Sequence, residues 1–333
     1  MNNRRKLIVA LGAGALTAPF GAYAQQQPQK IARIGFLSGR STPTATTPDP
    51  NADAFRQGLR DLGYIEGKNI LIESRYAEAK PDRVPSLVAE FLQLKVDVLV
   101  SPYSPAIRAA KEATKTVPIV ILTTDDPVAI GLVDSLARPG GNITGLTRLY
   151  RELDGKRLEL VKEAVPGISR VGVLVDLAGA ATSRPMEEYG AAGRVLKITL
   201  QALEVQSSKP NLEGAFLAAV KARVGALIVT RTSLLINSRK QIADLAIKHR
   251  LPLMSEGSDF VEAGGLMSYA SNETESFKRA AYYVDRILKG AKPADLPVEQ
   301  PTRFELVINM KTAKAIGLKI PHSLLQRVDK LIE

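Results

Sequence analysis

The chain has 333 residues, 45% hydrophobic and 24% charged, a balance that excludes disorder, collagen and coiled coil and suits two domains. It has no cysteine, which excludes disulfides, zinc–thiolate sites, iron–sulfur clusters and a cysteine nucleophile, and only two histidines. The net charge of +11 comes from basic residues scattered along the predicted helices, and tryptophan is absent, so we expect no nucleic-acid partner.

The first 24 residues have the pattern of an export signal. Positions 4–6 are basic, positions 7–20 are apolar, and the small residues Ala22 and Ala24 fit a cleavage pattern. The apolar segment is too short to cross a bilayer, and no later run reaches about 18 apolar residues. We therefore predict a signal peptide over 1–24, cleaved after Ala24, and a periplasmic chain with no membrane anchor, since it has no cysteine to carry a lipid.

Strand and helix patterns alternate over the first half of the remaining chain. Short apolar runs predict strands, and apolar residues at helical spacing predict the helices between them. The predicted strands are 31–37, 69–76, 96–100, 118–122 and 142–146. The predicted helices are 52–62, 84–92, one that begins with Ser104 as N-cap and Pro105 at the first position, and 128–136.

The same alternation restarts in the second half. The predicted strands are 171–175, 198–205, 226–230, 253–255, 265–269 and 304–308. The predicted helices are 158–165, 186–196, 211–224, 238–249, 272–288, 311–316 and 323–332, with N-caps at Asn211, Ser238 and Asn272. Alternating strands and helices indicate parallel sheets with right-handed crossovers. We predict an α/β fold of two doubly wound parallel-sheet lobes joined by a multi-strand hinge.

The last forty residues break this rhythm and are expected to cross between the lobes. The predicted signal peptide is 1–24. Lobe 1 is predicted to hold 31–146 and about 272–300, and lobe 2 to hold 147–271 and about 301–333.

Signatures of enzymes are missing from the mature chain. It has no Gly-x-Ser-x-Gly motif, Walker loop or His-Glu-x-x-His motif. His249 ends a predicted helix, where a positive charge suits the dipole, and His322 is expected to be exposed. Carboxylates alone could still bind a metal or hydrolyse a glycoside, but no spacing supports either. We predict a protein that is not an enzyme, with no catalytic residue, no metal and no cofactor.

Doubly wound sheets bind ligands at the carboxyl ends of their strands, and in a flavodoxin-like order the crevice lies between strands 1 and 3. The loops at these ends are 38–42, 101–106, 123–127, 176–180, 230–234 and 255–259.

Polar residues in these loops suggest a zwitterionic ligand. Ser104 at a helix N-terminus would favour a carboxylate, and Asp125, Asp126 and Asp176 would receive an ammonium group. Tyr103 would cover an apolar or aromatic side chain. Each has a plainer alternative: a helix cap for Ser104, a helix start for Asp126, a turn residue for Asp176 and a surface aromatic for Tyr103.

Two long segments, FRQGLRDLGY at 55–64 and LARPGGNITG at 136–145, are specific enough to compare with known families. Further segments of this kind are 66–69, 126–127, 155–160, 260–269, 304–309 and 311–315. Together they resemble the ABC transporter substrate-binding family typified by tryptophan/tyrosine-binding members. The resemblance covers essentially the whole mature chain and implies a type I periplasmic binding fold that delivers a small solute to a membrane permease with a separate ATPase.

The chain departs from the family pattern in two ligand loops. Positions 101–105 read Ser-Pro-Tyr-Ser-Pro where the family usually has a Gly-Thr-Pro-like loop, and 176–180 replace an Asn-Pro type of turn. Matching to the family favours Ser38, Ser104, Asp126 and Thr147 as ligand contacts. The predicted set also holds Tyr103, Asp125, Asp176, Arg231 and Ser255.

We therefore predict a periplasmic solute-binding component of an ABC importer that captures a small polar solute, an aromatic or branched amino acid, between two lobes. Its partners would be the solute and an ABC permease in the inner membrane, and it would be a monomer. Alternatives are a receptor for a sugar, nucleoside or aromatic acid, an exported enzyme on the same scaffold, and a ligand-binding partner of a kinase or chemoreceptor. A transcriptional regulator is disfavoured, because no DNA-binding helix pair precedes the first strand.

Overall fold

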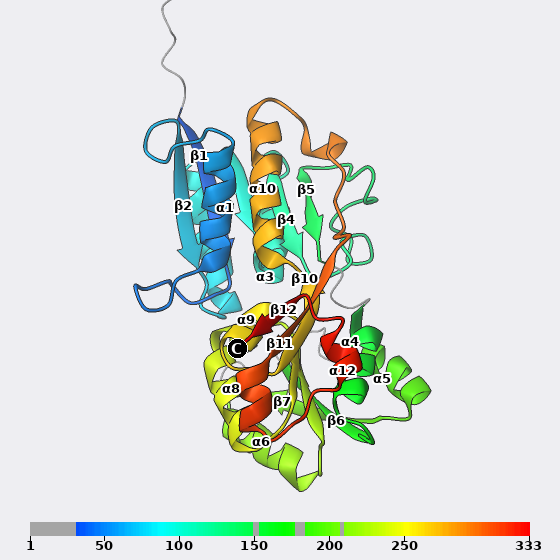
Figure 1. Ribbon diagram of the computed structural model, residues 1–333. Helices are drawn as coiled ribbons and strands as arrows, with labels where there is room; N and C mark the ends of the chain where they lie inside the picture. The colour runs from blue at the N-terminus through cyan, green and yellow to red at the C-terminus, as the bar shows by residue number, and fades with distance from the viewer. Residues whose placement is uncertain (1–30, 149–152, 177–183, 207–209) are drawn as a thin grey trace, which may run out of the picture. The chain divides into compact units, whose positions relative to one another are not determined.

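Two sheets organise the part of the chain that the structure, a computed structural model, describes: residues 31–148, 153–176, 184–206 and 210–333 (Figure 1). The first sheet has five parallel strands in the order β2-β1-β3-β4-β5. They are β1 (Ala32–Ser38), β2 (Ile70–Tyr76), β3 (Val98–Ser101), β4 (Ile119–Thr123) and β5 (Ile143–Thr147). The predicted doubly wound parallel sheet is confirmed, and its order is flavodoxin-like, with the switch of direction between β1 and β3.

Helices cover both faces of the first sheet. One face carries α1 (Pro50–Asp61) and α10 (Glu273–Leu288), and the other carries α2 (Val84–Gln93) and α3 (Ser104–Ala113), with a 3₁₀ turn at Pro81–Arg83. Side chains alternate across the sheet: Val98 and Val100 pack in the α1/α10 core, and Leu99 packs in the α2/α3 core. The α10 helix reaches this sheet from far along the chain (Figure 1).

The second sheet has seven strands in the order β12-β11-β10-β9-β8-β6-β7. They are β6 (Arg170–Asp176), β7 (Thr199–Val205), β8 (Ala226–Val229), β9 (Leu253–Ser255), β10 (Met267–Ser271), β11 (Phe304–Asn309) and β12 (Lys330–Ile332). All neighbours are parallel except β10 and β11, which pair antiparallel.

Two buried cores flank this second sheet. One takes side chains from α4 (Asp154–Ala164), α5 (Arg184–Leu196), α11 (Met310–Ala315) and α12 (His322–Leu325). The other takes side chains from α6 (Leu212–Lys221), α7 (Ser233–Asn237), α8 (Arg239–Lys248) and α9 (Ser258–Glu262). A 3₁₀ turn at Pro293–Asp295 follows α10.

Two predicted helices are wrong. Residues 128–136 form turns, because Gly131 has a φ of 68° and both Leu132 N–H and Val133 N–H donate to the Pro127 carbonyl. Residues 323–332 form the end of the short helix α12 and then β12, whose pairing with β11 overrides the helical pattern.

One predicted N-cap is also wrong, while Asn211 and Asn272 do cap their helices. Ser104 is the first residue of α3, so that its hydroxyl is directed elsewhere. Ser238 occupies the predicted N-cap position of α8 but makes no side-chain cap bond. No helix among the described residues is long and apolar enough to cross a membrane.

Candidate functional site

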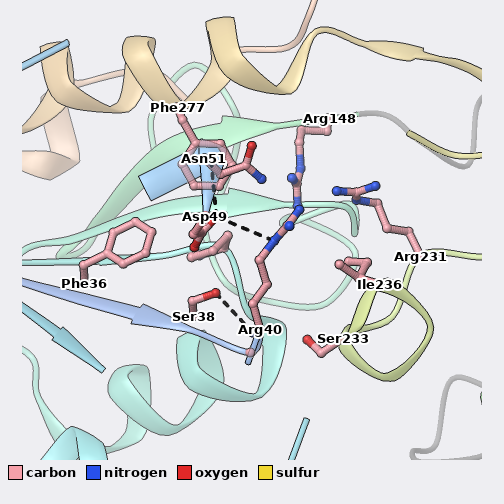
Figure 2. Close-up of a pocket in the computed structure, with 12 residues that line it drawn as sticks. Phe36, Ser38, Arg40, Asp49, Asn51, Arg148, Arg231, Ser233, Ile236 and Phe277 are labelled. Atoms are coloured by element: carbon pink, nitrogen blue, oxygen red, sulfur yellow. Dashed lines mark hydrogen bonds and ion pairs between the residues drawn. The ribbon is translucent and has the colours of Figure 1, made fainter. Parts of the chain in front are cut away.

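The ends of several strands line one pocket (Figure 2). Its wall combines residues at the carboxyl end of β1, after β3, after β5 and after β8, with the starts of α1, α7 and α10. This is the edge at which doubly wound sheets place their ligands. The lining residues are Phe36, Ser38, Gly39, Arg40, Asp49, Asn51, Pro102, Arg148, Arg231, Ser233, Ile236 and Phe277.

Five charged side chains form what we call the charge cluster: Arg40, Arg148, Arg231, Asp259 and Glu273. Glu273 joins two of the arginines, since its Oε1 accepts from Arg148 Nη1 and its Oε2 from Arg231 Nη2, each at 2.5 Å. Asp259 accepts from Arg231 Nη1 at 2.7 Å and from Arg40 Nη2 at 3.1 Å. The three arginines point towards one another around the pocket (Figure 2). All five side chains are at most 12% exposed, so these pairs are shielded from solvent.

The cluster joins residues that belong to different sheets. Glu273 begins α10, which packs on the first sheet, whereas Arg231 follows β8 of the second sheet. Arg40 follows β1, whereas Asp259 lies in α9 of the second sheet. The cluster therefore ties the two sheets together at the ligand edge.

The surroundings of Asp259 keep it ionised. Burial raises the pKa of its carboxyl group, and the charge of Glu273 acts in the same direction. The guanidinium groups of Arg231 and Arg40 outweigh both and hold the pKa of Asp259 below its ordinary value.

Asp49 and Asn51 form the wall at the start of α1. Asp49 is the N-cap, and its Oδ1 accepts from Asn51 N–H at 3.2 Å. The side-chain amide of Asn51 donates to Glu273 Oε2 at 3.0 Å, which connects this helix to the charge cluster. Asp49 is 5% exposed, and its Oδ2 has no hydrogen-bond partner among the described residues. Burial, and next the charge of Asp49, raise the pKa of Tyr76 to about 12, so the two groups lie close together.

A second buried polar group supports Arg231 from behind. Glu256 Oε2 accepts from Arg231 N–H at 3.0 Å, and Glu256 Oε1 accepts from Tyr189 OH at 3.2 Å. Arg157, fully buried, lies 3.9 Å from Glu256 and donates to Asp154 at 2.8 Å. These bonds fix the backbone from which the Arg231 side chain extends.

The rest of the wall is apolar and tightly packed. Phe36 and Phe277 lie with ring centroids 6.3 Å apart. Position 39 has room only for glycine, because a Cβ atom there would lie 2.2 Å from Ser233 Oγ and 2.6 Å from Tyr103 Cδ2.

Of the nine ligand contacts predicted from the sequence, Ser38 and Arg231 line this pocket. The Ser38 hydroxyl accepts from Arg40 N–H at 3.2 Å. Tyr103 follows the lining residue Pro102 and is half-buried.

Three other predicted contacts are bonded to one another beside the end of β5. Ser104 Oγ donates to Asp125 Oδ2 at 3.0 Å, and Thr147 Oγ1 donates to the Asp125 carbonyl at 3.2 Å. The hydroxyl of Ser104 thus pairs with a carboxylate.

Of the last three predicted contacts, Asp126 and Ser255 bond to nearby backbone groups, and Asp176 lies close to Tyr103. Asp126 is exposed, and its Oδ1 accepts from Val128 N–H at 2.9 Å. Asp176 ends β6; burial, and next the charge of Asp176, raise the pKa of Tyr103 to about 12. The Ser255 hydroxyl donates to the carbonyl of Gly257 at 2.9 Å.

The sequence reasoning did not single out most of the charged lining. Arg40 and Asp259 fall inside predicted ligand loops, and Arg148 follows the predicted contact Thr147, so position was the available signal. Asp49 and Glu273 carried no such signal, because acidic residues at helix starts are common for reasons of capping alone.

Comparisons with known proteins identify the family of this chain. The family model described as ABC transporter substrate binding protein matches residues 46–332. A tyrosine-binding protein of Clostridioides difficile (strain R20291) is 27% identical over 271 residues, which cover 81% of this chain and 77% of that protein.

Solved structures show the same likeness. A conserved domain protein from Vibrio cholerae is 28% identical with a TM-score of 0.81, over 91% of this chain and 100% of that one. The ABC domain in complex with L-Trp from Streptococcus pneumoniae is 25% identical with a TM-score of 0.79, over 90% and 99%. A leucine binding protein from Thermotoga maritima, 12% identical with a TM-score of 0.55 over 86% and 87%, shares the fold.

Proposed function

The chain belongs to the ABC transporter substrate-binding protein family and has a type I periplasmic binding fold, and from this premise we propose that it captures an aromatic amino acid for an ABC importer. The observation that carries the proposal is a pocket lined by three arginines, by Asp49 and by two phenylalanines, with Asp259 and Glu273 paired to the arginines.

The charges of the pocket favour a zwitterion. The lining residues Arg40, Arg148 and Arg231 face Asp49 and the paired carboxylates of Asp259 and Glu273, so these six formal charges sum to zero. A buried charge without a partner costs several kcal/mol. A ligand with one positive and one negative group leaves this balance unchanged, whereas a net anion or cation disturbs it. Guanidinium groups suit a carboxylate because they donate two parallel hydrogen bonds.

Two observations support an aromatic side chain on the ligand. Phe36 and Phe277 are buried side chains that give the pocket an apolar wall, against which the ring of an aromatic ligand would pack. The similar proteins are named as tyrosine-binding and as a complex with L-Trp.

Capture would depend on contacts with both sheets. A ligand shifts an equilibrium between open and closed forms only by its differential affinity for them. A carboxylate held by Arg148 and Arg231 at once would supply that difference, because these arginines follow strands of different sheets.

The cellular setting belongs to the same proposal. The signal peptide predicted over 1–24 lies outside the described residues, and its cleavage would release a monomeric periplasmic receptor. Its partner would be an inner-membrane permease of the same importer, and it would not alter its ligand chemically.

Native mass spectrometry of the purified protein, repeated after denaturation, tests the proposal by identifying any co-purified solute. A thermal-shift panel of aromatic and branched amino acids, sugars, nucleosides and aromatic acids completes it. An aromatic amino acid at about 100 times its Kd should add about 2.7 kcal/mol of stability. The chain has no tryptophan, so indole fluorescence would report bound L-tryptophan directly. Binding of a sugar or nucleoside without any amino acid, or turnover of the solute, would overturn the proposal.

A further inference from the structure

The acidic groups around the pocket differ in how fully they are bonded. Glu273 accepts from Arg148, Arg231 and Asn51, and Asp259 accepts from both Arg231 and Arg40. Their oxygens are therefore already engaged by donors of the protein.

Asp49 is different, because only one of its oxygens is bonded among the described residues. Oδ1 accepts from Asn51 N–H and caps α1, while Oδ2 is buried and has no hydrogen-bond partner there. The nearest cation is Arg40, whose Nε lies 3.9 Å from Oδ1, beyond hydrogen-bond distance. The other close group is the buried Tyr76 hydroxyl. Burial, and next the nearby charge of Asp49, raise the pKa of Tyr76, but its hydroxyl has no partner within hydrogen-bond distance among the described residues. A buried carboxylate oxygen of this kind costs free energy unless something donates to it.

We propose that Asp49 receives the ammonium group of the ligand while the arginines of the charge cluster hold its carboxylate. This inference rests on the proposed function and specifies its chemistry: the protein selects α-amino acids over the corresponding acids that lack the amine. Asp49 thereby has two roles, one oxygen for the helix and one for the ligand.

The geometry favours Asp49 over the acidic residues chosen from the sequence. Asp125 already accepts from the Ser104 hydroxyl, and Asp126 is exposed and caps a turn. Of Asp49 and the three predicted residues Asp125, Asp126 and Asp176, Asp49 alone lines the pocket with Arg148 and Arg231 (Figure 2).

The test crosses a change in the ligand with a change in the protein. Isothermal titration calorimetry of the wild-type protein compares L-tyrosine with 3-(4-hydroxyphenyl)propanoate, and L-tryptophan with indole-3-propanoate; each pair differs only by the amine. The same titrations are made with Asp49→Asn, which keeps an oxygen to cap α1 and removes the charge. Asp53→Asn is the matched control, since Asp53 lies in the same helix turn and its side chain is 65% exposed.

We expect removal of the amine to weaken binding about 10- to 100-fold in the wild type and in Asp53→Asn. In Asp49→Asn the same removal should change the affinity less than about threefold. An equal loss in Asp49→Asn and wild type overturns the inference and leaves the proposed function standing. If Asp126→Asn, rather than Asp49→Asn, abolishes the difference in affinity between each amino acid and its amine-free partner, the ammonium group is assigned to Asp126 and the inference is also overturned. If neither amino acid binds the wild-type protein, the proposed function fails and the inference falls with it.

A measurement on the wild type covers the case in which Asp49→Asn does not fold. In a crystal structure of the complex, a ligand ammonium nitrogen within about 3.2 Å of Asp49 Oδ2 supports the inference. An ammonium group bonded to other carboxylates overturns it.

Discussion

Glu273→Gln is the substitution that best tests the charge cluster. The Glu273 carboxylate neutralises two guanidinium groups, Arg148 on Oε1 and Arg231 on Oε2, and also accepts from the Asn51 amide. Glutamine has nearly the same shape, but it keeps only one oxygen and turns an NH₂ group towards donors. The change therefore removes the charge while the space stays filled.

The expected loss of stability follows from the bonds that remain. The glutamine oxygen still accepts a hydrogen bond from one arginine, but the bond to the other arginine is lost. A hydrogen bond to a charged group contributes about 1.5–3 kcal/mol of stability. Loss of a partner in a buried pair costs about 3–5 kcal/mol, but Arg231 keeps Asp259 and Arg148 keeps the Leu122 carbonyl. We therefore expect the free energy of unfolding to fall by about 2–3 kcal/mol, measured by urea denaturation at pH 7 with an unchanged slope.

Glu275→Gln is the matched control, because Glu275 lies in the same first turn of α10 and is exposed. Both substitutions remove a negative charge near the helix N-terminus, which contributes about 0.3–1 kcal/mol, so their difference isolates the cluster. A Glu273→Gln protein within about 0.5 kcal/mol of the control would refute the reasoning that these pairs hold the two sheets together.

Two further predictions concern the same pocket edge. Gly39→Ala should lower ligand affinity at least about tenfold, because the new methyl group lies 2.2 Å from Ser233 Oγ and the loop must shift. Gly141→Ala, where a Cβ meets nothing within 4 Å, should leave the titration unchanged; equal affinities for both variants would contradict the close approach. The second prediction concerns pH. The pKa of Asp259 is lower in the folded protein than the value of 3.8 that it has in the unfolded chain. The ionised carboxylate therefore stabilises the fold fully above pH 3.8, and this stabilisation is lost as the pH falls through the lower pKa of the folded protein. Asp259→Asn should therefore flatten the acid side of a stability curve recorded between about pH 2 and pH 7, and a parallel curve would show that Arg231 does not depress this pKa.

The order of strands in the first sheet was predictable because each element has a local signal. Apolar runs and helical spacing lie within single segments of the chain, and the crossover rule then arranges them. The failures occur where distant residues decide. Residues 330–332 become a strand because they pair with β11, and Asp329 exchanges backbone and side-chain hydrogen bonds with Leu306. At 128–136 the spacing was helical, but Gly131 in the left-handed region ends any helix there.

The charge cluster was beyond sequence reasoning for the same reason. Arg148 and Glu273 are 125 positions apart, and Arg40 and Asp259 are 219 apart, so no spacing rule connects them. Loop position, joined for Ser38 by the family resemblance, brought Ser38 and Arg231 into the predicted set, and both line the pocket.

The choice of an ammonium acceptor shows what the structure adds to loop position. The strand ends offered Asp125, Asp126 and Asp176, whereas Asp49 carried no signal in the sequence. Hydrogen-bond accounting separates them, because a carboxylate oxygen that already accepts from a hydroxyl or a backbone N–H must give up that bond to gain a ligand's. Asp125 would release Ser104, and Asp126 would release Val128, whereas Asp49 Oδ2 releases nothing among the described residues. The net gain from binding an ammonium group is therefore greatest at Asp49, to which the sequence patterns assigned no role.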